Sequence, residues 1–146
     1  MASKPIMLSP RPASVADLIG IDADELETAF VCEEWRAELA TGLVHLGPET
    51  AALHDLSGTR CGIMDLIQFY EPADWQKVLL ALEEASTVST TFSFATAIRP
   101  GPGLYRPVFC FGRSDLEGMA GGVLFGTFAI ARLCLETASG RHGMVN

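Results

Sequence analysis

Three histidines and four cysteines are the side chains of this chain that could ligate a metal ion or a haem iron. The histidines are His45, His54 and His142. The cysteines are Cys32, Cys61, Cys110 and Cys134. These positions are widely separated and show no C-x-x-C pair and no Cys/His spacing that fits zinc. We therefore expect no metal site, histidines that are surface or half-buried side chains, and reduced thiols that are mostly buried.

Acid–base catalysis needs a carboxylate and a second titratable group that meet in a cleft, and the sequence does not assemble such a pair. The carboxylates expected on helices are Asp65, Asp74, Glu83 and Glu84. The last two are adjacent and point to different sides of a helix, so we expect them to be solvated. The Gly-rich residues 118–122, GMAGG, lack the context of a phosphate-binding loop and are typical of a hairpin loop. The sequence predicts no catalytic residues and no enzyme.

Composition excludes several classes of partner. The chain has 146 residues, 49% of them hydrophobic and 19% charged, which indicates one globular domain. A net charge of −8 argues against a nucleic-acid surface. No apolar run is long enough to span a membrane, and the N-terminus lacks the apolar block of a signal peptide. We therefore expect a cytoplasmic protein that binds neither nucleic acid nor membrane.

The elements that would position a site begin with a hairpin. In residues 35–39, Trp35, Ala37 and Leu39 alternate with charged residues, as in a half-buried strand. A turn at Thr41-Gly42, in which the glycine supplies a positive φ, leads to the partner strand at residues 43–46. Pro48 then opens a helix, because proline is tolerated at the first helical position.

The rest of the chain reads as helices followed by three strands. We expect a helix over residues 23–33, short helices at 48–56 and 63–70, and a longer one at 72–85. Strands follow at 90–99, 104–113 and 122–133. This order predicts an α+β fold with a five-stranded antiparallel sheet and helices on one face. Residues 1–13 are expected to be a disordered lead, 14–33 a helical cap and 136–146 a flexible tail.

Two segments carry a resemblance to a known family. WRAELATGLVHLGPE is similar to the W-x-x-(D)-L-x-T-G-x-v-x-x-S-P-E opening of PAS domains, and DLIQFYEPADWQKV to their D-L-x-x-x-H-P-D-D-x-x-x-V middle. The resemblance, to sensory domains of the PAS fold-3 type, implies a PAS domain over residues 34–135. It also implies a sheet order 2-1-5-4-3, counting the five expected strands along the chain.

The chain departs from the family at two places. Glu71 stands where the family has the His of H-P-D-D, and residues 126–133 lack the Asp-Ile-Thr motif that passes a signal to an effector. Only eleven residues follow Leu135, so we expect a stand-alone PAS protein or a piece whose effector lay at the C-terminus.

The resemblance also bears on cofactors and ligands. Haem-binding PAS domains usually carry their ligand histidine in the long helix, and residues 72–85 contain none. Residues 58–62, around Cys61, do not match the flavin-binding motif, so we expect neither haem nor flavin. The candidates for a ligand pocket are Trp75, Leu79, Phe92, Phe94, Phe109 and Phe111. The sequence leaves open which strand face points inward and whether these side chains only fill the core.

The last two strands are apolar on both sides, which predicts cover on both sides. We expect the outer face to meet the helix at 23–33 and a second copy of the chain, giving a homodimer. The leading hypothesis is a sensory or regulatory PAS module in signal transduction. It would act through protein–protein interaction and homodimerisation, with a small ligand in its core as an option.

Two alternatives remain. One is a small α+β enzyme or hydrophobic-ligand carrier with a cone-shaped sheet, which needs a His–Asp pair in a deep cavity. The other is a structural dimerisation module without a ligand.

Overall fold

A computed structural model describes residues 22, 24, 28–118 and 121–136 of the chain. Within them, one antiparallel sheet has seven strands in the order β3-β2-β1-β6-β5-β4, and β7 pairs with β5. The strands are β1 (Phe30–Glu38), β2 (Leu43–His45), β3 (Arg60–Gly62), β4 (Thr91–Ile98), β5 (Leu104–Asp115), β6 (Val123–Ala131) and β7 (Leu135–Glu136). The helices are α3 (Pro48–Leu53), α4 (Ile63–Ile67), the 3-10 helix η2 (Pro72–Asp74) and α5 (Trp75–Thr87).

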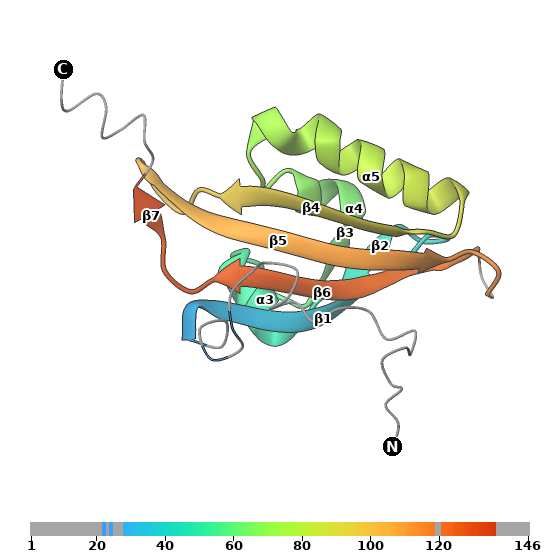
Figure 1. Cartoon of the computed structure of the whole chain (residues 1–146), viewed down its shortest axis with the longest axis horizontal. Helices are drawn as coiled ribbons and strands as arrows, with labels where there is room; N and C mark the ends of the chain where they lie inside the picture. The colour runs from blue at the N-terminus through green and yellow to red at the C-terminus, as the bar shows by residue number, and fades with distance from the viewer. Residues whose placement is uncertain (1–21, 23, 25–27, 119–120, 137–146) are drawn as a thin grey trace.

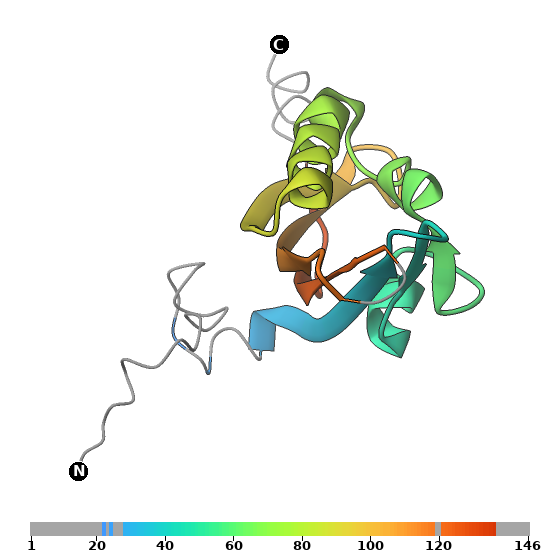
Figure 2. The ribbon, with the colours of Figure 1, turned by 90° about the vertical axis from the view of Figure 1, so that its right-hand side faces the viewer.

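The sheet curls, and its long central strands β5 and β6 lie between β4 on one side and β1 on the other (Figure 1). Seen from the end, α4 and α5 lie on the concave side of the curled sheet (Figure 2). The five expected strands occur in the order β2-β1-β6-β5-β4. Two further short strands, β3 and β7, join these five. β3 and β7 have three and two residues, and unlike the similarly short β2 neither follows a recognisable hairpin turn from a longer predicted strand.

The predicted hairpin is present. Trp35 and Ala37 are buried on the concave side, and Gly42 has a φ of 72° in the turn that leads to β2. β1 pairs along its whole length with β6, from Phe30 opposite Ala131 to Glu38 opposite Val123. The expectation that the hairpin neighbours the last long strand is therefore confirmed.

The expected helix over residues 23–33 is wrong at its C-terminal end. Asp24, Thr28 and Ala29 have helical geometry, but β1 begins at Phe30. The backbone of Phe30 and the residues after it is taken up by the ladder with β6, and this tertiary pairing overrides the local helical pattern. The lead at 1–13, most of the cap at 14–33 and nearly all of the tail at 136–146 lie outside the described residues.

A pair of opposed glycines makes room for the largest side chain of the core. Gly112 and Gly126 face each other across β5 and β6, and Trp35 of β1 is the next partner of Gly126. A Cβ on Gly112 would lie 2.7 Å from Cζ of Phe92 and 2.8 Å from Cζ2 of Trp35. The space left by the missing side chain of Gly112, called the glycine slot below, is filled by the indole ring of Trp35 and the phenyl ring of Phe92. It therefore determines the position of Trp35.

None of the helices in the described part of the chain combines the length and the apolar character that crossing a bilayer requires.

Candidate functional site

The space between sheet and helices is the position where a ligand pocket was expected. Its lining comes from both layers and includes Trp35, Tyr70, Phe94, Cys110 and Phe128. The cavity they enclose has a volume of about 20 Å³. A space of this size admits about one water molecule, whereas pockets for drug-sized ligands span about 300–1,000 Å³. The interior of the described residues is therefore a packed core.

The six pocket candidates separate into those that face this core and those that do not. Phe94 lines the small cavity. Phe92 packs at its margin, with its ring centroid 6.1 Å from that of Trp35 in an edge-on arrangement. Leu79 packs against the core but also lines a groove on the surface. These three lie on the side that the hypothesis required.

Phe109 and Phe111, which were candidates while the inward face of the strand was left open, lie on the outer face of the sheet. Val108 and Cys110 of the same strand are buried at 0% and 1% exposure, so the alternation of β5 directs the two phenylalanines to the opposite face. Both rings are half-buried there. This part of β5 is apolar at both sets of alternating positions, so the sequence pattern could not show which set faces the core.

Trp75 is also misplaced in the prediction, because it is 36% exposed and does not line the cavity. Its indole Nε1 donates a hydrogen bond to the carbonyl oxygen of Tyr70 at 2.9 Å. Trp75 therefore fastens the start of α5 to the segment that precedes it.

The Glu71-Pro72-Ala73-Asp74 segment, which carries part of the family resemblance, attaches α5 to β4. Glu71 forms an ion pair with Arg99, and its backbone N–H donates to the carbonyl oxygen of Ala97 at 3.0 Å. Thr96 donates its hydroxyl hydrogen to Asp74 Oδ2 at 2.7 Å. The glutamate that replaces the family's histidine thus has a structural contact on this chain.

His54 is fully buried, which corrects the expectation that the histidines are surface or half-buried. Its Nδ1 lies 2.8 Å from the carbonyl oxygen of Thr50, and its Nε2 lies 2.9 Å from the hydroxyl of Tyr70. Because a carbonyl only accepts, Nδ1 carries the hydrogen, and the tyrosine hydroxyl donates to Nε2. Both ring nitrogens are therefore occupied.

Burial controls the protonation of this pair. It lowers the pKa of His54, and the Thr50 carbonyl opposes that shift only in part. Burial also raises the pKa of Tyr70 well above its usual value. Both side chains are therefore neutral near pH 7, as their hydrogen bond requires. The rings of Phe69 and Phe128 lie edge-on or tilted to the imidazole, with centroids 6.1 and 5.7 Å away.

Glu33 is a second polar side chain whose position differs from the prediction, which put it at the end of a helix over residues 23–33. It lies in β1, and its carboxylate accepts hydrogen bonds from the backbone N–H groups of Thr50 at 2.7 Å and Glu49 at 3.3 Å. Burial acts to raise its pKa, but the contacts with Thr50 and Glu49 lower it on balance. A Cβ on Gly47 would collide with the carboxylate of Glu33, so the glycine leaves room for this carboxylate to cap α3.

The histidine–carboxylate pair that an enzyme would need in a deep cavity is not formed at His54. His45 does approach a carboxylate, with Nε2 3.3 Å from Oε2 of Glu38, but both side chains are about one-third exposed. Within the described residues, no cluster of three histidine, cysteine or acidic side chains is arranged to hold a metal ion. His142 lies outside them.

The cysteines are less buried than expected, since Cys110 alone of the four is fully buried. Burial raises the pKa of Cys110 well above its usual value, and a contact with the Trp35 indole lowers it to a smaller extent. Partial burial raises the pKa of Cys32 and Cys61 as well. The thiolate that a redox sensor needs is therefore disfavoured at these three positions.

No pattern in the sequence predicts the contact between His54 and Tyr70 or the contacts of Glu33 with the start of α3. The partners of each contact are 16 or 17 residues apart, and neither contact follows a local spacing rule. The curled sheet and the position of α3 bring them together.

No protein-family model and no curated protein sequence matches this chain. Among solved structures, the N-terminal domain of a diguanylate cyclase with PAS/PAC sensor from Marinobacter aquaeolei is similar, with 14% identity and a TM-score of 0.51. The match covers 77% of this chain and 100% of that one. A sensory box histidine kinase/response regulator from Burkholderia thailandensis E264 matches at 14% identity and a TM-score of 0.49, over 78% of this chain and 82% of that one. The first likeness shows that the described residues have a PAS-like fold.

Proposed function

We propose that this chain is a PAS-type sensory or regulatory module that acts in signal transduction through protein–protein interaction and homodimerisation, without catalysis. The observation that carries this proposal is a packed interior beneath a PAS-like sheet. A module whose core leaves about 20 Å³ free has its chemistry available at its surfaces rather than inside. The ligand option of the original hypothesis is correspondingly weakened.

The outer face of the sheet is the surface proposed for self-association. Phe109 and Phe111 of β5 and Phe125 of β6 are half-buried on this face. The ring of Phe30 extends the apolar surface, with its centroid 5.8 Å from that of Phe109. Aromatic side chains supply large contact areas at interfaces. A second copy that covers this face would remove these rings from water.

We also propose that the module works without haem or flavin. His54, the buried histidine, uses both ring nitrogens within the protein, and the core cavity lined by its neighbours Tyr70 and Phe128 is far smaller than either group. An ultraviolet–visible spectrum of purified protein tests this part. A Soret band or a flavin spectrum would contradict it.

We propose a cytoplasmic location, which the free state of the four cysteines supports. An enzyme or carrier function is disfavoured, because the His45–Glu38 pair lies near the surface and the cavity between sheet and helices of the described residues has a volume of only about 20 Å³.

Sedimentation equilibrium over a range of concentrations tests the homodimer. We expect the unmodified chain to associate and Phe111→Glu to shift the equilibrium toward monomer, because the interface would bury an unpaired charge. Gln76→Glu adds the same charge at an exposed position of α5 and should leave association unchanged. A monomeric unmodified chain at micromolar concentration would overturn the homodimer.

A further inference from the structure

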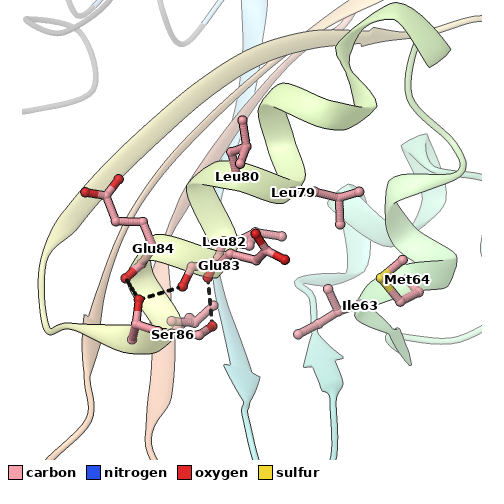
Figure 3. Close-up of a pocket in the computed structure, with 10 residues that line it drawn as sticks. Ile63, Met64, Leu79, Leu80, Leu82, Glu83, Glu84 and Ser86 are labelled. Carbon is pink, nitrogen blue, oxygen red and sulfur yellow. Dashed lines mark hydrogen bonds between the residues drawn. The ribbon is translucent and has the colours of Figure 1, made fainter.

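A groove with a volume of about 840 Å³ runs along the surface between α4 and the C-terminal half of α5. Figure 3 shows Leu79 and Leu82 of α5 directed toward Ile63 and Met64 at the start of α4. Leu124 of β6 contributes from the sheet. The groove is therefore built from two helices and the start of one central strand. Its floor adjoins the packed core, because Ile63, Leu82 and Leu124 also line the small core cavity.

Two large apolar side chains that line the groove are mostly exposed to solvent. Met64 and Leu80 are 58% and 56% exposed, although both belong to helices whose other sides are packed. Methionine has a flexible, polarisable side chain that adapts to different partners. Exposed apolar side chains that gather around a concave surface mark an interaction site more often than scattered ones do.

The charged side chains that line the groove are all negative. Glu83 and Glu84 line it, both exposed, and the residues that line it include no lysine or arginine among those described. Asp65 is exposed on α4 next to Met64. The net charge of the chain is −8. An apolar surface flanked by carboxylates is complementary to an apolar segment that carries positive charges.

We propose that this groove binds a basic, amphipathic α-helical segment of a partner protein. Apolar side chains at i, i+3, i+4 and i+7 of such a helix would contact Ile63, Leu79 and Leu82, as in other helix-in-groove complexes. Its lysines or arginines would lie near Glu83 and Glu84. This proposal rests on the interaction role proposed above and names the chemistry of the partner.

A synthetic fluorescent peptide of leucine and lysine, with leucines at that spacing, is the probe, and fluorescence anisotropy measures its binding. We expect saturable binding to the unmodified chain that weakens as salt is added. Leu80→Ser and Met64→Ser remove apolar contacts without adding charge, and each should weaken binding at least about tenfold. Leu133→Ser is the matched control, because Leu133 is 78% exposed and follows the opposite end of β6 from Leu124. It should leave binding unchanged.

Charge is tested separately by Glu83→Lys/Glu84→Lys, which should also weaken binding of the basic peptide. An analogue with glutamate in place of every lysine keeps the apolar face and should not bind. No saturable binding of the basic peptide, equal binding of both peptides, or equal binding to the groove variants and the unmodified chain would overturn the proposal.

A second copy of this chain is the competing occupant. If Leu80→Ser converts a dimer of the unmodified chain into a monomer, the groove is a self-association surface and the proposal is wrong. Phe111→Glu separates this proposal from the proposed homodimer. It should change the oligomeric state and leave peptide affinity unchanged, so that each proposal can fail independently.

Discussion

The two faces of the sheet are built by the same strands but differ in packing. On the concave face, Val108 and Cys110 of β5 and Phe128 of β6 are at most 1% exposed. On the outer face, Phe109, Phe111 and Phe125 are half-buried. Both faces carry aromatic side chains, but charged residues such as Arg36 and Arg113 also lie on the outer face. The helices of the described chain complete only the concave face (Figure 2).

The difference shows that apolar composition does not by itself define a core. The concave face is tightly packed because side chains of other elements, such as Tyr70 and Val78, cover it. The close approach of Trp35 to Gly112 adds to this packing. The phenylalanines of the outer face have fewer partners among the described residues: Phe30 packs against Phe109, and the Arg113 guanidinium lies 5.0 Å from the centre of the Phe125 ring. We interpret the first face as the source of stability and the second as an interaction surface.

The largest expected effect compares one phenylalanine on each face. Phe128→Ala should lower the free energy of unfolding by about 3–5 kcal/mol, because it leaves a cavity beside Trp35 and His54. Phe111→Ala should cost less than about 1.5 kcal/mol, because its ring is half-buried. Urea denaturation at low protein concentration measures both. Equal losses would mean that the outer face is as fully packed as the concave one.

The second comparison concerns glycines. Gly112→Ala should cost about 1–3 kcal/mol, since the new Cβ forces the rings of Trp35 and Phe92 to move. Gly58→Ala is the control, because a Cβ there meets nothing within 4 Å. Thermal unfolding of the two variants checks the difference. If Gly112→Ala is as stable as Gly58→Ala, the ring positions are not held by the slot.

The two tyrosines of the chain provide a third comparison. Tyr70→Phe should cost about 1–2 kcal/mol, because it leaves the buried Nε2 of His54 without its donor. Tyr105→Phe, at a half-buried position of β5, should change the free energy of unfolding by only about 0.5 kcal/mol or less. Denaturant titration distinguishes them. Equal effects would contradict the assignment of a buried hydrogen bond to His54.

The smallest expected effect is a pH dependence that arises on the concave side. The pKa of His54 lies below its usual value of 6.5 when folded, so the unfolded chain binds a proton there that the folded protein does not. Stability is therefore complete above pH 6.5 and falls as pH decreases toward the lowered pKa. A decrease in melting temperature as the pH falls below 6.5, together with an imidazole NMR signal of His54 that titrates at a lower pH than a histidine of the unfolded chain, checks this. An imidazole that titrates at 6.5 in the folded state would contradict it.

Acidic conditions add a separate loss. The lowered pKa of Glu33 means that its contribution is present above pH 4.5 and declines below that value. This second decline follows protonation of the carboxylate that caps α3.

The sequence alone determined the elements whose pattern is local. The alternation around Trp35, the glycine at Gly42 and the proline at Pro48 each act through the backbone geometry of a few residues. The hairpin is present, and α3 begins at Pro48 as expected but ends at Leu53 rather than at residue 56. The three long strands follow from the same kind of signal. The resemblance to PAS domains rested on these elements, and the described fold agrees with it.

The tertiary structure decided which way the strands face and which distant groups meet. A shift of one residue in register exchanges the faces of a strand, and β5 is apolar in both registers, so only its pairing with β4 and β6 put Val108 and Cys110 inside and Phe109 and Phe111 outside. Pairing with β6 likewise makes Phe30 the first residue of β1, although the local pattern predicted a helix there. The contacts of His54 with Tyr70 and of Glu33 with Thr50 depend on the position of α3 against the curled sheet, which no short stretch of sequence specifies.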